Sequence, residues 1–145
     1  HGPTGNGRRQ SYQHLPIPRM TNTFIAAGAH TVDDIIAATP RGLYAKKLGA
    51  GQVDVTSGDF VFAVTEGYLI EAGKVGRPVR GATIVGNGPQ ALHKIDMVGN
   101  DLKLAHGTCG KEGQGVTDSV GQPTIRISAL PIGGTSVLPG GAKRP

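Results

Sequence analysis

The sequence has 145 residues, about the size of one domain, with 24 glycines, 10 prolines and a formal net charge of +5. No apolar run approaches the roughly 18–20 residues that cross a bilayer, and the one cysteine, Cys109, excludes both an internal disulfide framework and a four-cysteine zinc site. The basic residues are spread along the chain without interleaved aromatic residues, so no stacking platform for nucleic acid is expected, and the cysteine usage predicts a cytoplasmic protein.

The opening segment, residues 1–22, is predicted to be extended and without a core of its own. It contains several Gly, Pro and Asn-Gly turn signals, and it carries Arg8, Arg9 and Arg19 without any acidic residue. Such a segment is expected to lie across another surface. Because the sequence begins at His1 without a signal segment, we interpret it as part of a longer protein.

The first regular elements of the predicted domain over residues 23–135 are a helix and a strand. Thr31 is a suitable N-cap, and Asp33 and Asp34 follow in the first turn, where carboxylates stabilise the positive end of a helix. The helix is expected to end before Pro40, because a residue that precedes proline avoids helical geometry. A short strand is predicted over residues 42–47.

The middle of the chain predicts strands. Apolar and polar residues alternate over residues 53–56, and Phe60, Phe62 and Val64 alternate with the residues between them, which is typical of a strand. After a possible bulge at Gly67, residues 68–70 are expected to continue this strand. The sequence Glu-Ala-Gly-Lys at residues 71–74 predicts a hairpin turn, and residues 75–80 are expected to return antiparallel.

A second helix is predicted to begin after Asn87, with Pro89 in the first turn, where a missing N–H costs nothing. Its apolar side would carry Leu92, Ile95 and Met97, and it would end at Gly99 and Asn100.

Further strands are predicted over residues 101–104 and 124–130, and a flexible tail over residues 136–145. Strands outnumber helices and do not alternate regularly with them. The predicted fold is therefore α+β, dominated by a mostly antiparallel sheet, with about two short helices.

One short motif could carry chemistry. Cys109 lies between Thr108 and Gly110, with His106 three residues before it and Lys111 two residues after it. A nearby cation favours the thiolate, which is both a nucleophile and a zinc ligand. A catalytic zinc ion needs about three protein ligands, however, and His106 with Cys109 would supply only two. From these residues alone, a nucleophile, a metal ligand and an inert cysteine all stay open.

Several longer strings resemble the C-terminal part of the TldD/PmbA family. They are residues 3–9, 18–23, 51–58, 74–88, 97–102, 109–114 and 120–124, among them Pro-Arg-Met-Thr-Asn-Thr and Cys-Gly-Lys-Glu-Gly-Gln. The match runs in order over residues 3–135 and is closer to the TldD branch than to PmbA. This family contains zinc metallopeptidases, also called modulators of DNA gyrase, that cleave unfolded peptides.

The resemblance implies that Cys109 is a zinc ligand. In the TldD branch, two histidines of an H-E-x-x-x-H helix and a cysteine of the C-terminal domain hold the metal, and the glutamate activates water. No histidine of this sequence is followed by glutamate. The helix would belong to a missing N-terminal domain, so this fragment is expected to hold no catalytic residue and to be inactive alone. The stretch before Cys109 is also shorter than the family's usual loop.

The resulting prediction is the C-terminal domain of a zinc-dependent metallopeptidase, which supplies Cys109 to a one-ion site completed by the absent helix. Expected partners are a peptide or unfolded protein substrate bound as an extended strand, the missing N-terminal domain, and an identical or paralogous subunit in a dimer. Neither a membrane nor nucleic acid is expected as a partner. Arg8, Arg9 and Arg19 could bind a substrate carboxylate, pair with acidic residues of the missing domain, or face water.

Two alternatives come from other functional classes. The chain could be a non-catalytic assembly module of the same family, or it could have a gyrase-associated, nucleic-acid-binding role. A steep salt dependence of DNA binding would support the second alternative.

Overall fold

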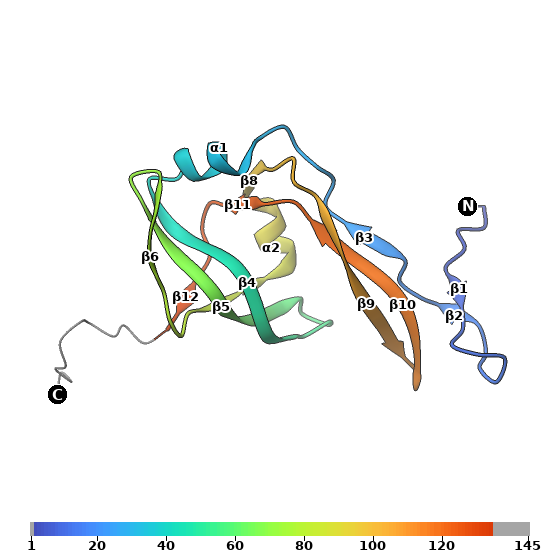
Figure 1. Cartoon of the computed structure of the whole chain (residues 1–145). Coiled ribbons are helices and arrows are strands. Elements are labelled where there is room, and N and C mark those ends of the chain that lie inside the picture. The colour runs from blue at the N-terminus through green and yellow to red at the C-terminus, as the bar shows by residue number, and fades with distance from the viewer. Residues whose placement is uncertain (1, 135–145) are drawn as a thin grey trace, which may run out of the picture. The chain divides into compact units, whose positions relative to one another are not determined.

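The computed structural model describes residues 2–134, which form twelve strands and two six-residue helices in mostly antiparallel sheets (Figure 1). This confirms the predicted β-dominated α+β class. Within the described residues, neither helix is long and apolar enough to cross a membrane. The chain divides into two compact units: unit 1 comprises residues up to 31 together with 98–125, and unit 2 comprises residues 32–97 together with those from 126 onward.

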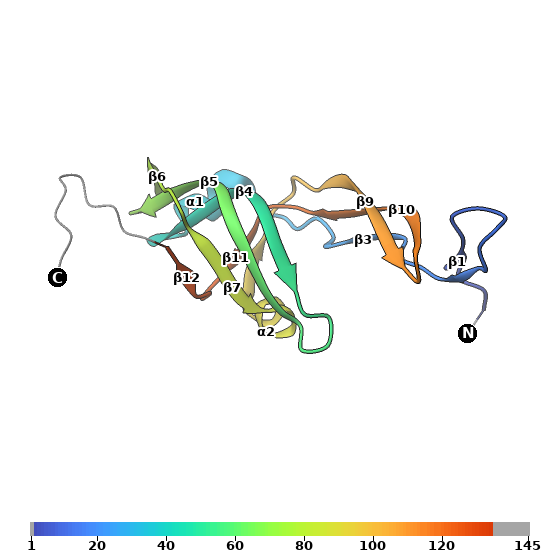
Figure 2. The same cartoon turned by 90° about the horizontal axis from the view of Figure 1, so that it is seen from below.

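The larger sheet belongs to unit 2 and is built around one long strand, β5 (Asp59–Glu71). The strand β4 (Arg41–Val53) pairs along one side of β5, and β7 (Thr83–Asn87) and β6 (Lys74–Pro78) pair along the other. A short strand, β12 (Ile132–Gly133), pairs with β7. All these pairings are antiparallel, and β4, β5 and β7 run side by side in Figure 2.

The hairpin turn predicted over residues 71–74 is confirmed. Glu71 and Lys74 are paired, and the two residues between them, Ala72 and Gly73, both have positive φ angles, of 49° and 71°. Two consecutive positive φ angles are what a two-residue type I′ turn requires. The register of β4 against β5 shifts at Lys46, directly opposite the step from Glu66 to Gly67, so the irregularity predicted at Gly67 lies on the partner strand.

The strand predicted over residues 53–56 is wrong beyond Val53, which ends β4. The Asp54 carboxylate accepts hydrogen bonds from the N–H groups of Thr56 (2.8 Å) and Ser57 (3.3 Å), and the N–H of Gly58 donates to the Asp54 carbonyl at 2.7 Å. These bonds form a turn, which an aspartate in this position favours over a strand. The strand predicted over residues 42–47 is longer in the structure, where β4 runs from Arg41 to Val53.

The two helices begin where the sequence predicts. The first, α1 (Val32–Ala37), follows Thr31 and ends before Pro40, as predicted. The second, α2 (Gly88–His93), is capped by the Asn87 side chain, which accepts a hydrogen bond from the N–H of Gln90.

The end predicted for α2 is wrong, because the N–H of Lys94 bonds back to Ala91 and Leu92 and terminates the helix there. Ile95 and Met97 belong instead to a strand, β8 (Ile95–Val98), which forms a two-stranded sheet with β11 (Ile125–Ile127). Between them Asp96 is exposed and pairs with Arg126 at 2.8 Å. Burial over residues 95–97 therefore alternates with the period of a strand and not with that of a helix.

The core of unit 2 is small and apolar. Its most buried hydrophobic residues are Ile35 on α1, Val64 and Ile70 on β5, and Ala82 before β7. Along a strand whose sheet is covered on one face, successive residues are expected to alternate between buried and exposed, as they do around Val64 in β5.

Within the described residues, the sheet of unit 1 has three strands and, unlike the larger sheet of unit 2, includes a parallel pair. It contains β3 (Asn22–Phe24), which runs parallel to β10 (Gln114–Gln122), and β9 (Lys103–Lys111), which forms an antiparallel hairpin with β10. Two short strands, β1 (Gly7–Arg8) and β2 (Ile17–Pro18), pair with each other in the opening segment. The sequence predicted only the first residues of β9 and none of β10.

The interior of unit 1 is mainly polar. Its buried side chains include Arg19, Gln114 and Asp118, and the fully buried Pro123 is the apolar exception. Hydrogen bonds, rather than an apolar core, therefore hold the described part of unit 1 together. The flexible tail predicted over residues 136–145 lies outside the described residues.

Candidate metal-ligand site

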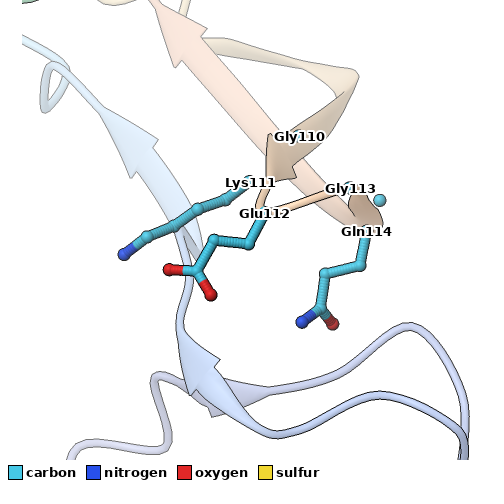
Figure 3. A pocket seen from close by; sticks show the side chains of 6 residues that line it. Gly110, Lys111, Glu112, Gly113 and Gln114 are labelled. Atoms are coloured by element: carbon cyan, nitrogen blue, oxygen red, sulfur yellow. The ribbon is translucent and has the colours of Figure 1, made fainter.

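The candidate site is the end of the β9–β10 hairpin, where Cys109 lies on β9 opposite Val116 of β10. The thiol is free and partly exposed. Two residues with positive φ angles, Glu112 (51°) and Gly113 (70°), make the turn after Lys111. The hairpin end borders an open hollow of about 420 Å³, and the side chains of Lys111 and Gln114 extend from it (Figure 3).

The surroundings of Cys109 favour its thiolate form. The backbone N–H of Met20 makes the largest contribution and the Arg19 side chain the next, and together they lower the pKa of the thiol from its ordinary value. Partial burial and the Asp118 carboxylate act in the opposite direction. Lys111, which the sequence suggested for this task, instead donates to the carbonyl of Pro18 at 3.4 Å and is not among the causes of the shift.

Among the charged residues within 2–134, Arg19 is the most buried, with a relative exposure of 3%. Its Nη2 donates to the backbone carbonyl of Cys109 and, at 2.9 Å, to that of Gln114. One nitrogen atom of the guanidinium thus connects the two strands of the hairpin close to the thiol. A buried arginine in this position serves its own unit and does not face water.

Arg8 has a similar role in the same segment. Its Nη1 donates to the carbonyl of Thr117 at 2.8 Å, and its Nη2 donates to the carbonyl of Met20. Of the three arginines in the opening segment, Arg9 is the one that is exposed. Arg8 and Arg19 therefore both donate hydrogen bonds to backbone carbonyl groups of unit 1.

The glutamines at residues 10 and 114 complete the attachment of the opening segment. The side-chain oxygen of Gln114 accepts from the N–H of Gln10 at 3.1 Å, and its amide nitrogen donates to the carbonyl of Leu15 at 3.1 Å. In return, the N–H of Gly115 donates to the side-chain oxygen of Gln10 at 2.6 Å. The segment predicted to lie across another surface lies, in this structure, against the β9–β10 hairpin.

His106 does not join Cys109. Both residues belong to β9, and side chains three residues apart on a strand point to opposite faces of the sheet. His106 borders a separate hollow of about 400 Å³ together with Asn22, Leu104 and Ser119. A two-ligand site made by His106 and Cys109 is thus incompatible with the geometry of β9.

No group of three or more histidine, cysteine, aspartate or glutamate side chains that could hold a metal ion occurs within residues 2–134. A partly exposed thiol with a lowered pKa nevertheless suits one position of a zinc site, since the thiolate is the form that binds the metal. The residues present therefore fit a single ligand of a shared site and not a whole site.

Comparison with known proteins identifies the family to which this β-rich chain belongs. A family model described as the PmbA/TldA metallopeptidase C-terminal domain matches residues 1–134. The chain belongs to this family. A metalloprotease TldD homolog from Haemophilus influenzae is 54% identical over 135 residues, which are 92% of this chain and 28% of that protein.

More distant members of the PmbA/TldD family show the same match. A zinc metalloprotease TldD homolog from Saccharolobus solfataricus is 35% identical over 132 residues, which are 91% of this chain and 30% of that protein. The crystal structure of TldE from Thermococcus kodakarensis shares the fold, with a TM-score of 0.70 and 23% identity over 90% of this chain and 27% of that one. This chain therefore spans about three tenths of the length of these relatives.

The family resemblance pointed to Cys109, but the sequence did not indicate which residues lie beside it. For Arg19 the sequence suggests only contacts with a substrate, another domain or water, because Arg19 and Met20 lie about 90 residues earlier in the chain than Cys109. The available signal was the string Pro-Arg-Met-Thr-Asn-Thr, in which an arginine stands in a segment without acidic residues.

Proposed function

We propose that this chain is the C-terminal domain of a zinc-dependent peptidase of the PmbA/TldD family and that Cys109 supplies one ligand of its zinc site. The observation that carries the proposal is the setting of the thiol, which is partly exposed and has a pKa lowered by the Met20 N–H and by Arg19. The names of the relatives support it, because they are metalloproteases and one of them is a zinc metalloprotease.

The role of the chain's own residues follows from their positions. Cys109 would hold the metal, and the β9–β10 hairpin with the opening segment would fix the direction of the sulfur. Zinc, when bound, supplies a Lewis acid that lowers the pKa of water to about 7 for hydrolysis of a peptide bond. The remaining ligands and the general base would come from outside residues 2–134, so the fragment alone would be inactive.

The edge of the unit 1 sheet suggests how a substrate would bind. In the sheet order β3-β10-β9, the described residues leave the outer edge of β9 without a partner strand, and Cys109 belongs to this strand. An extended peptide can add to such an edge through backbone hydrogen bonds. A peptide or unfolded protein segment paired with β9 would therefore pass the thiol, whereas a folded substrate could not adopt this conformation.

The setting proposed for the enzyme is the cytoplasm, where a lone free thiol stays reduced. The protein would act as a dimer with an identical or paralogous subunit, and the N-terminal domain that completes the metal site would belong to the same longer chain.

The experiment that tests the proposal replaces Cys109 with serine in the full-length protein. Serine has nearly the same size, so the fold should change in stability by less than about 1 kcal/mol. A neutral hydroxyl is a much poorer zinc ligand than a thiolate, so zinc content and peptide cleavage, measured on the same sample, should both fall. The matched control is Thr108→Ser, which changes the adjacent residue on β9, whose side chain points to the opposite face.

Zinc content and cleavage at wild-type levels in Cys109→Ser would show that the thiol is not a ligand. Retained zinc with lost cleavage would also contradict the proposal, because the residue would then act on the substrate and not on the metal. Loss of both in Cys109→Ser, with neither lost in Thr108→Ser, is the expected result.

A further inference from the structure

The guanidinium of Arg19 contacts the residue that carries the candidate ligand, and it does so through the backbone. Its Nη2 donates to the carbonyl of Cys109 and, at 2.9 Å, to the carbonyl of Gln114. These carbonyls belong to the two strands of the hairpin, on either side of its turn. A single donor therefore fixes both strands next to Cys109, 90 positions away from Arg19 in the sequence.

The burial of Arg19 indicates that this contact is not an ordinary surface interaction. Its relative exposure is 3%, and its Nε and Nη1 have no hydrogen-bond partner within the described residues. Burying a guanidinium is unfavourable unless its charge and its donors find partners. The hydrogen bonds to the carbonyls of Cys109 and Gln114 are therefore what holds the buried guanidinium in place.

We propose that Arg19 is a positioning residue for Cys109, which holds the backbone of this residue so that its sulfur keeps one direction toward the metal. The inference rests on the proposed function of Cys109 as a metal ligand. It assigns Arg19 no contact with the substrate, because its guanidinium is buried against the hairpin. Removing a group that holds a metal ligand in place typically weakens metal binding by about 10–100-fold.

A merely structural role would give a different pattern. Gln10 comes from the same segment and accepts from Gly115 at the same hairpin end, but it has no hydrogen bond to Cys109. If Arg19 only attached the segment to the hairpin, Gln10→Ala would weaken metal binding in the same way as a change at Arg19.

The test uses the full-length protein and four variants: Arg19→Met, Arg19→Lys, Gln10→Ala and Arg9→Met. The zinc dissociation constant is measured by competition with a chromogenic chelator, and kcat and KM for a peptide are measured at saturating zinc. We expect Arg19→Met to weaken zinc binding about 10–100-fold and to lower kcat while KM stays unchanged. Arg19→Lys, which keeps a charged donor, should recover part of both losses.

Gln10→Ala and the exposed Arg9→Met should bind zinc within about twofold of the wild type. The proposal is overturned if Arg19→Met binds zinc as tightly as the wild type, if it raises KM alone, or if Gln10→Ala weakens zinc binding equally. If Arg19→Met fails to fold, Arg19→Lys carries the test: wild-type zinc affinity together with wild-type kcat in Arg19→Lys would overturn the proposal.

Cys109→Ser, measured alongside, separates this inference from the function on which it rests. If Cys109→Ser keeps its zinc, the proposed function fails. If Cys109→Ser loses zinc while Arg19→Met does not, the proposed function stands and the positioning role of Arg19 fails.

Discussion

Replacing Arg8 with methionine should loosen the opening segment without unfolding the protein. Arg8 donates two hydrogen bonds, to the carbonyl of Thr117 at 2.8 Å and to the carbonyl of Met20. A bond from a charged donor contributes about 1.5–3 kcal/mol, and the lower end applies because Arg8 is only half-buried. Two such bonds give about 3 kcal/mol of local stability.

Part of this stability is offset in the wild type. The Nε of Arg8 is buried without a hydrogen-bond partner in the described residues, and removing it should return about 1 kcal/mol. The net loss in Arg8→Met is therefore about 2 kcal/mol, which corresponds to a roughly 30-fold increase in local opening. Methionine keeps the length and the apolar stem of the side chain, so the packing of its neighbours should be preserved.

Native-state hydrogen exchange measures this opening directly. The N–H of Arg19 donates to the carbonyl of Asn6 at 2.8 Å and reports on the segment, whereas the amides of β5 report on unit 2. Exchange at Arg19 should become about 30-fold faster in Arg8→Met, while β5 is unchanged. The matched control is Arg9→Met, at an exposed position. Exchange within about twofold of wild type in Arg8→Met, or equal acceleration in Arg9→Met, would refute the reasoning.

Two further predictions concern unit 2. Ile70→Ala removes a side chain that is 6% exposed and should lower the free energy of unfolding of unit 2 by about 2–5 kcal/mol. The control, Val55→Ala, changes a residue that is 92% exposed and should alter this free energy by less than about 0.5 kcal/mol. Urea denaturation followed by hydrogen exchange in β5 measures both. Hydrogen bonds from Lys46 and Lys47 lower the pKa of Glu66 from 4.5 to about 2, so its stabilising effect is present above pH 4.5 and is lost as the pH falls toward 2. Glu66→Gln should remove this part of the pH dependence of the thermal midpoint between pH 5 and pH 2, and an unchanged profile would contradict the assignment.

The elements that the sequence predicted well are those in which local preference and tertiary structure agree. Alternating residues in β5 fit a sheet covered on one face, and Gly73 fits the positive φ angle of its position in the turn. Asn87 caps α2 because a side-chain oxygen can accept an N–H of the first turn. In each case residues within one element determine the outcome.

The missed elements depend on pairing with distant residues. Strand β10 contains Gln, Gly, Thr, Asp and Ser and has few β-branched apolar residues, so it gives no clear periodic signal. It is a strand because β9 and β3 pair with its two edges. The candidate site shows the same dependence, since the family resemblance indicated Cys109, but the contacts of Arg19 and Met20 with it arise only when the opening segment folds onto the hairpin.

The two units obtain their stability from different interactions. The unit that contains the candidate site, unit 1, is the one whose interior is mainly polar. In unit 2, apolar side chains such as Val64 and Ile70 are buried between elements. In unit 1, the buried groups are mainly polar, and Arg19 and Asp118 keep buried atoms without partners in the described residues. Such atoms are uncommon in folded proteins because each lowers stability, and they occur most often where a function requires them.

Apolar side chains would hold the β9–β10 hairpin at a smaller energetic cost, since a buried charge is often less stabilising than a well-packed hydrophobic residue. Apolar packing, however, has no directional preference, whereas the hydrogen bonds of Arg19 fix particular carbonyl groups in place. A metal ligand requires a fixed direction, because its distance and angle to the metal decide the affinity. A polar interior around Cys109 is therefore what a hairpin needs if its task is to orient one sulfur atom, and changes at Arg19 should alter metal binding more than they alter the stability of unit 2.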